Sequence, residues 1–392
     1  MSKGILQAQQ GSDNSHFFPL IDLLRAFAAI LVIVYHVIVI SEWTDFPVEG
    51  WWFLLFRAGW IGVDLFFVIS GFVITLTALK EHERSGTLFI ANYIQRRWMR
   101  IAPLYFCTLL IYLILVDPSA LLQGYKAALA HLFTHLFFIH NLLPETHGSI
   151  NGPNWSVALE MQFYLMIAFI TPWLARTHPI KLLLLFIGTA ITYRLVTTLV
   201  FTPGISSTHV QYVYSSQLPG SLDAFGLGIA FALLMTGYRY STLAKRLQPG
   251  WINTALWSTS ATVCIYLTWT SYWNTSNYWD DHMMIGLWRT ALAFSFASVL
   301  AICLTLPLSR RLLSPFRPFL YLGKISYGLY LWHMPVLLTL LRFDWSDKNR
   351  LLAMTLICTV LLSAASWHFF EKRFLKDKRT KCNQRPTPLA AQ

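Results

Sequence analysis

Long, nearly uninterrupted apolar runs are the feature of this sequence that most limits how it can fold. A helix that crosses the hydrocarbon core of a bilayer needs roughly 20 mainly apolar residues, and about ten segments of the 392-residue chain qualify. Only 12% of the residues are charged, whereas soluble domains average about 25%. The sequence therefore excludes an ordinary soluble protein, a disordered chain and a nucleic-acid binder. It predicts an all-α, polytopic transmembrane helix bundle.

The predicted spans cover residues 18–40, 53–79, 101–116, 156–174, 180–201, 219–237, 252–272, 284–308, 322–342 and 350–370. A further apolar stretch, 128–143, is short and contains three histidines, so we interpret it as an interfacial or re-entrant helix. With ten spans, most of the 30 Lys and Arg residues fall on one side, which the positive-inside rule assigns to the cytoplasm. Both termini are therefore expected in the cytoplasm. No small-residue cleavage site follows the first span, which is expected to stay as an anchor.

The predicted domain organisation is a cytoplasmic tail (1–16), one transmembrane domain (17–375) and a basic cytoplasmic tail (376–392). The net charge of +12 comes from cations between apolar runs, so the expected partner is the lipid bilayer and not a nucleic acid. The five cysteines suggest no disulfide framework. His131 and His135 have the spacing of metal ligands but lack an HExxH pattern, so we predict no metal and no bound cofactor.

The first span contains three ionisable residues, Asp22, Arg25 and His36. Such residues inside a span are costly and mark functional sites by default. Arg25 and His36 are eleven residues apart, which on a helix corresponds to a difference of about 20° in direction and ~16 Å in height. They therefore share one stripe, which favours a lined cavity. Alternatively, Arg25 reaches lipid head groups and His36 bonds to a neighbouring helix.

Glu160 lies near the start of the fourth predicted span, which runs antiparallel to the first. Glu160 and His36 are therefore expected at similar depth near the outer surface, where a carboxylate and an imidazole can form an acid/base pair. The alternative is that Glu160 only complements the N-terminal dipole of its helix.

Arg96, Arg97 and Arg100 cluster at the cytoplasmic mouth of the third span. Clustered guanidinium groups suit phosphate oxygens through forked hydrogen bonds, although lipid anchoring would use the same residues. Asp64, in the second span, either lines a cavity or is a structural partner of an arginine. Gly62 and Gly71 in that span would allow close helix approach.

The remaining cavity-lining candidates are polar residues at helical spacing within predicted spans. They could line the same cavity as Arg25 and His36 or make interhelical hydrogen bonds. These candidates are Tyr164, Ser326, Tyr330 and His333.

Five motifs occur in order: IDLLRAFAAILVIVYHV, GWIGVDLFFVISGFVI, RRWMRIAPLYF, WSVALEMQFYL and ISYGLYLWH. Together they resemble the membrane acyltransferase-3 family, bacterial enzymes that O-acylate sugars of surface polysaccharides or macrolides. The resemblance covers about residues 17–375. It implies that His36 is the essential histidine of the Arg-x10-His motif, that Arg25 is equally required, and that Arg97 and Arg100 belong to the acyl-CoA side. Glu160 matches the first acidic position of the family pattern, and Met161 replaces the second.

The resemblance implies an O-acyltransferase of the bacterial cytoplasmic membrane that uses acyl-CoA, by default acetyl-CoA. Its acceptor would be a carbohydrate at the outer face, such as an exopolysaccharide, an O-antigen, a periplasmic glucan or a small glycoside. The extracytoplasmic hydrolase-like domain of some members is not expected here, so the acyl group would go directly to the acceptor or to a separate partner protein. Cavity-lining residues alone would equally suit a transporter or flippase of a lipid-linked sugar, which would consume no acyl-CoA.

Overall fold

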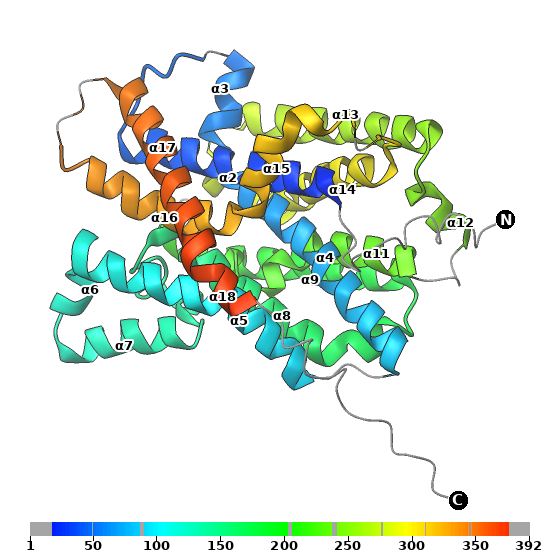
Figure 1. The fold of residues 1–392 in the computed structure, drawn as a ribbon, viewed down its shortest axis with the longest axis horizontal. Coiled ribbons are helices and arrows are strands. Elements are labelled where there is room, and N and C mark those ends of the chain that lie inside the picture. Colours follow the sequence, from blue (N-terminus) through cyan, green and yellow to red (C-terminus); the bar gives the residue numbers. More distant parts are fainter. Residues whose placement is uncertain are drawn as a thin grey trace, which may run out of the picture.

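The computed structural model describes residues 18–375, apart from 49, 87–89, 203–205, 237–240, 276, 310, 344 and 346. The described residues form a bundle of helices, and no strand occurs among them (Figure 1). This confirms the all-α bundle expected from the apolar runs. The predicted tails at 1–16 and 376–392 lie outside the described residues.

Eight helical segments are long and apolar enough to cross a membrane. Short helices and 3₁₀ or π turns extend several of them. The eight segments are α2 (Pro19–Ile40), α4 (Gly62–Ser85) with its preceding turn, α5 (Ile90–Ile111) with a π turn to Val116, α8 (Trp155–Leu174), α9 (Pro179–Val200), α11 (Leu222–Thr236) with its preceding turn, α14 (Arg289–Thr305) after a π turn, and α17 (Lys348–Ser366) continued by a π turn and α18 (Lys372–Leu375).

Two of the ten predicted spans are helical but fall outside this group of eight. The segment 252–272 forms α13 (Trp251–Trp273), which is long enough but is made less apolar by its many Ser and Thr residues. The segment 322–342 is not one helix, because the chain breaks at Ile325 between α15 (Arg317–Lys324) and α16 (Ser326–Leu340). Gly323 accounts for the tight docking of α15, since a Cβ there would collide with the backbone of Asp22.

The stretch 128–143 forms a short helix, α7 (Tyr125–Leu136), followed by a 3₁₀ turn. Twelve helical residues rise about 18 Å, well short of a hydrocarbon core of about 30 Å. This length agrees with an interfacial or re-entrant helix. The remaining short helices are α3 (Gly50–Arg57), α6 (Ser119–Leu122), α10 (Thr208–Ser215) and α12 (Ser241–Ala244).

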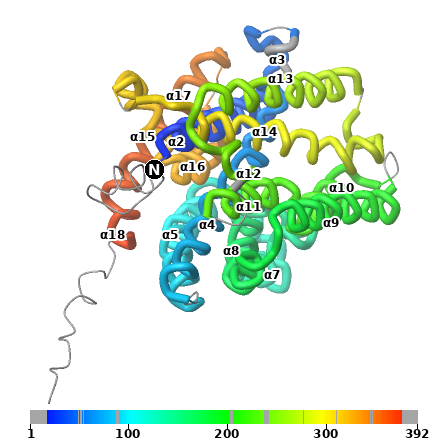
Figure 2. The backbone as a smooth tube through the Cα atoms, turned by 90° about the vertical axis from the view of Figure 1, so that its right-hand side faces the viewer, coloured from blue at the N-terminus to red at the C-terminus, as the bar shows by residue number. Residues whose placement is uncertain are grey.

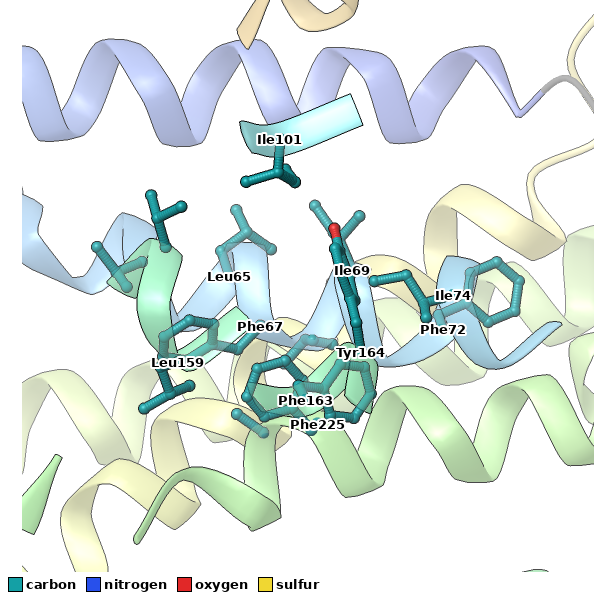
Figure 3. Close-up of a cluster of buried hydrophobic side chains, with 14 of the residues drawn as sticks. Leu65, Phe67, Ile69, Phe72, Ile74, Ile101, Leu159, Phe163, Tyr164 and Phe225 are labelled. Atoms are coloured by element: carbon teal, nitrogen blue, oxygen red, sulfur yellow. The ribbon is translucent and has the colours of Figure 1, made fainter. Parts of the chain in front are cut away.

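Glycines let α4 pack against its neighbours at backbone distance. A Cβ on Gly71 would collide with the Phe225 carbonyl oxygen of α11, and one on Gly62 would approach the Ala28 carbonyl oxygen of α2. Beside the α4–α11 contact the Phe67 and Phe163 rings stack on Phe225, with centroids 4.8 and 4.0 Å away (Figure 3). Close packing at both glycines confirms what the sequence predicts for Gly62 and Gly71.

α2 carries Arg25 and His36, the two residues of the first span that the family motif singles out. Pro19, in its first turn, fits the start of a helix because no intrahelical partner is lost there. The helix packs against α4, α15 and α16 (Figures 1 and 2). Arg25 and His36 therefore lie on one continuous helix at two levels of the bundle.

Candidate functional site

His36 lines a cavity of about 520 Å³, which we call the His36 cavity. The cavity lies where α2 ends and α4 begins, and the loop before α8 and the helix α10 contribute to its wall. Its volume is within the range of small-molecule sites, roughly 300–1,000 Å³. The lining residues are Tyr35, His36, Ile40, Trp60, Val63, His147, Gly148, Gly152, Pro153, Trp155, Thr208, His209, Tyr212, Tyr272, Tyr278, Trp279, Arg289, Tyr330 and Met334.

Hydrogen bonds fix the neutral tautomer of His36. Its Nδ1 lies 2.9 Å from the Val32 carbonyl oxygen, and a carbonyl can only accept, so Nδ1 carries the hydrogen. His333 lies alongside, with its Nδ1 donating to the Tyr330 carbonyl at 2.6 Å and its Nε2 3.3 Å from His36 Nδ1. His36 Nε2 is therefore an acceptor, as a general base requires.

Aromatic side chains make up much of the wall around His36. Tyr35 meets the His36 ring edge to face at 5.0 Å, and Trp60, another lining residue, packs 5.7 Å from Trp288. Tyr212 contacts both Trp155 and Trp279 edge to face. Such rings offer flat apolar faces with polar tips, which suits ligands that are apolar on one face and hydroxylated at the edge.

A second cavity, of about 340 Å³, is lined by three of the predicted arginines, and we call it the arginine cavity. Its wall is built mainly from α4, α5, α8 and the first turns of α16. The lining residues are Arg25, Val63, Phe66, Phe67, Ser70, Val73, Ile74, Arg97, Arg100, Ile101, Ser156, Val157, Glu160, Tyr164, Ser326, Tyr327 and Tyr330. Three guanidinium groups face one carboxylate, so this cavity favours anions.

Stacking and pairing hold Arg97 and Arg100 in place. The Arg97 guanidinium stands over the Tyr93 and Tyr164 rings, 5.5 and 5.6 Å from their centroids. Arg100 lies 5.2 Å over Trp367 and 4.0 Å from the Glu371 carboxylate. These contacts involve π faces or one edge of each guanidinium, which leaves donors for a ligand.

Arg96, the third arginine of the predicted cluster, lies elsewhere. It forms an ion pair with Glu81, and its side chain is 46% exposed. Arg96 lines neither cavity, because on a helix successive residues point about 100° apart. Only Arg97 and Arg100, one turn apart, share the face that borders the arginine cavity.

Glu160 belongs to the arginine cavity and not to the surroundings of His36. Its Oε1 accepts hydrogen bonds from Ser70 Oγ at 2.7 Å and from the Tyr164 hydroxyl at 2.8 Å. The position beside His36 that the sequence argument gave to Glu160 is occupied by His333. The reason is that equal depth in the bundle does not fix which side of a helix faces which neighbour.

The two cavities follow one another along α2 and share part of their walls. Arg25 borders the arginine cavity, and His36, about three turns later, borders the His36 cavity. Val63 and Tyr330 line both. The Tyr330 hydroxyl donates to the Pro153 carbonyl at 2.9 Å and lies 2.6 Å from Ser156 Oγ, so it is held between the cavities.

Three of the predicted cavity residues lie beside the cavities and not in their walls. Asp22 pairs with Arg25 at 3.9 Å, and Asp64 pairs with Arg289 at 3.0 Å. His333 is fully buried against His36. Ser326, Tyr330 and Tyr164 do line the arginine cavity. Asp64 thus has the arginine partner that was the alternative reading for this residue.

Sequence reasoning missed Arg289 and the aromatic wall of the His36 cavity. Arg289 lies inside a predicted span, and an arginine in a span is a signal for function that could have been used. The Trp and Tyr residues carried no such signal, because aromatic residues near span ends are expected at any membrane interface.

Comparison with known proteins agrees with the five motifs. The family model of an acyltransferase domain matches residues 18–369. A peptidoglycan O-acetyltransferase of Listeria monocytogenes is 28% identical over 92% of this chain and 56% of its own length. An O-acetyltransferase of Staphylococcus aureus is 25% identical over 91% of this chain and 57% of its own length. The chain thus spans about half the length of these curated relatives, and no solved structure matches it. The chain belongs to the membrane acyltransferase-3 family, as a multi-pass membrane protein.

Proposed function

We propose that this protein is an O-acetyltransferase of the bacterial cytoplasmic membrane that moves an acetyl group from acetyl-CoA to a hydroxyl of a carbohydrate at the outer face. The observation that carries the proposal is the succession of two cavities along α2, one lined by arginines and one by a histidine base. Family membership supports the acyl transfer, and the names of the relatives support acetyl as the group and a glycan as the acceptor.

The arginine cavity is the proposed donor side. Arg97 and Arg100 would hold phosphate oxygens of coenzyme A through charge-assisted hydrogen bonds. The pantetheine arm would then pass Arg25 and reach toward Tyr330, and the ~16 Å between Arg25 and His36 is of the order that this extended arm spans. Glu160 would keep Tyr164 and Ser70 in place on the wall of this cavity.

The His36 cavity is the proposed acceptor side. Its aromatic rings present faces for pyranose rings, and His36 Nε2 is free to accept a proton. Peptidoglycan is what the Listeria monocytogenes relative is named for, and we propose a glycan of the cell envelope as the acceptor here. The glycan would receive the acetyl group directly or through a separate extracytoplasmic protein.

In the proposed reaction, His36 Nε2 removes the proton of the acceptor hydroxyl while the oxygen attacks the thioester carbonyl. The C–O bond forms, the C–S bond breaks, and the proton returns from His36 to the coenzyme A thiolate. A two-step route in which His36 Nε2 first takes the acetyl group uses the same atoms. His333 supports His36 in both routes, because it fills the space beside Nδ1.

The test is acetyl transfer from radiolabelled acetyl-CoA by membranes that contain the full chain. We expect His36→Ala to lose transfer by about 100-fold or more, since general base catalysis contributes 10²–10⁴-fold. His368→Ala is the matched control. His368 lies in the π turn that follows α17, contacts Tyr321 and Lys372, and lines neither cavity. Transfer that survives in folded His36→Ala protein would refute the assignment. Movement of a lipid-linked sugar without release of coenzyme A would instead identify a flippase.

A further inference from the structure

Two arginine–aspartate pairs are buried within the bundle, Arg194 with Asp223 and Arg289 with Asp64, and they differ in how many donors of the arginine are used. Arg194 is fully buried, and all three of its nitrogens are engaged. Nε donates to the Gly286 carbonyl, Nη1 to the Gly220 carbonyl, and Nη2 to both Asp223 and Thr290. This pair joins α9, α11 and α14, and four of the five N–H groups of Arg194 are engaged in it. Arg194 is therefore a structural link between these helices and lines neither cavity.

Arg289 uses only one side of its guanidinium group. Nε and Nη2 both bind Asp64 Oδ1, at 3.2 and 3.0 Å. Among the described residues, Nη1 has no hydrogen-bond partner and Asp64 Oδ2 has none either. Arg289 is 6% exposed, so bulk water does not surround these donors. Protein atoms fully enclose the unpaired Asp64 Oδ2 but not Arg289 Nη1. A ligand can therefore reach Nη1 and supply the partner that it lacks.

The unused edge of Arg289 borders the His36 cavity. Arg289 is one of its lining residues, and its guanidinium stands 5.9 Å over the Trp60 ring. None of the described residues that line this cavity is Asp or Glu, because Asp64 lies behind Arg289 and outside the wall. The cavity thus presents one fixed cation, aromatic faces and the His36 base.

We propose that Arg289 is an anion-binding residue of the His36 cavity and that the acceptor is a saccharide that carries a carboxylate. Nη1 and the outer hydrogen of Nη2 form the end-on fork of the guanidinium, which binds a planar carboxylate through two parallel hydrogen bonds. Asp64 fixes the opposite edge, so the fork has one orientation. This inference rests on the proposed function in that it takes the His36 cavity as the acceptor side.

Arg289 and His36 would then hold one sugar at two points. The carboxylate would bind the fork, a ring face would lie on the aromatic wall, and the reacting hydroxyl would meet His36 Nε2. Two fixed points on a rigid ring restrict which hydroxyl reaches the base. Arg289 is accordingly a specificity-determining residue and Asp64 a positioning residue that acts through it.

The experiment measures binding and needs no turnover. Calorimetry on the purified full chain in detergent compares cellobiouronic acid with cellobiose, which differ in one carboxylate. We expect the acid to bind at least about tenfold more tightly, as a charge-assisted hydrogen bond allows. The preference should weaken at high salt.

Arg289→Gln alone would leave Asp64 as a buried charge without a counterion, and the protein could fail to fold. The informative variant is therefore Arg289→Gln with Asp64→Asn, which keeps a neutral hydrogen-bonding pair. It should bind both disaccharides equally, at the affinity of the wild type for cellobiose. Arg289→Lys, which keeps the charge but loses the fork, should retain part of the preference.

Equal binding of the two disaccharides by the wild type, or a preference that persists in the double variant, would overturn the proposal. So would the absence of binding by both. Tighter binding of cellobiose 6-phosphate than of the carboxylate would overturn the choice of carboxylate. His36→Ala separates this result from the proposed function, because it should abolish acetyl transfer and leave the preference for the acid intact.

Discussion

At the scale of single residues, the contacts of each side chain separate the arginines of α5 into two groups. Arg97 and Arg100 stand over aromatic rings at the wall of the arginine cavity. Arg96, their neighbour in sequence, pairs with Glu81 and is half exposed. An exposed ion pair of this kind contributes roughly 0–1 kcal/mol, so Arg96 offers a control with the same side chain.

We expect Arg97→Gln combined with Arg100→Gln to raise the KM for acetyl-CoA by about tenfold or more, because two charge-assisted phosphate contacts are lost. The measurement is initial rate against acetyl-CoA concentration in membranes. Arg96→Gln should change KM by less than about twofold, as a weak surface pair does. An equal rise in both variants would assign the cluster to binding of lipid head groups.

At the scale of elements, the contact between α4 and α11 depends on one glycine from each helix. Gly71 of α4 lies against the backbone of α11, and Gly228 of α11 lies against the backbone of α4. A Cβ on Gly228 would meet the Val68 carbonyl oxygen, just as one on Gly71 would meet Phe225. Backbone atoms cannot move aside as a side-chain tip can, so the helices would have to separate. The stacked rings of Phe67, Phe163 and Phe225 lie beside this contact (Figure 3).

We expect Gly228→Ala to lower the free energy of unfolding by about 2 kcal/mol or more through overpacking. Gly188→Ala is the matched control, since nothing lies within 4 Å of a Cβ at this position in α9. That change should leave stability unaltered or raise it by about 0.5–1 kcal/mol, because alanine favours the helix. Thermal unfolding in detergent, followed by tryptophan fluorescence, measures both. Equal melting temperatures for the two variants would contradict the glycine argument.

At the scale of the whole molecule, a buried histidine outside the spans links stability to pH. His147, in the loop before α8, is 8% exposed and stacks on Trp155. Burial, together with the nearby His209, lowers the pKa of His147 from 6.5 to about 4. The folded protein therefore keeps this imidazole neutral at pH values where the unfolded chain protonates it.

Because the folded-state pKa lies below the unfolded value, the unfolded chain binds more protons between pH 6.5 and 4. Stability should be highest above about pH 6.5 and fall as the pH falls through this window. We expect the melting temperature to decline from pH 7 to pH 4.5, and His147→Gln to make this decline shallower. Parallel curves for the wild type and the variant would show that His147 does not contribute.

The apolar runs predicted the helices well because spanning the hydrocarbon core imposes length and composition on each segment separately. The break at Ile325 escaped this reasoning, because residues 322–324 continue the apolar run along the chain but belong to a separate helix, α15. That helix packs on α2, where Gly323 meets the backbone of Asp22, and a contact between distant segments cannot be read from an apolar run. Periodicity on α2 likewise placed Arg25 and His36 on one stripe, because both residues belong to one helix.

The sequence by itself determined that this is a helical membrane protein of the acyltransferase-3 family with Arg25 and His36 on its first span. These conclusions depend on composition, on order along the chain and on contacts within one helix, all of which are local. Only the tertiary structure decided that His36 lies beside His333, that Glu160 lies with the arginines, and that Arg289 enters the His36 cavity. Those facts depend on how each helix is rotated against its neighbours, and side-chain packing between distant segments sets that rotation.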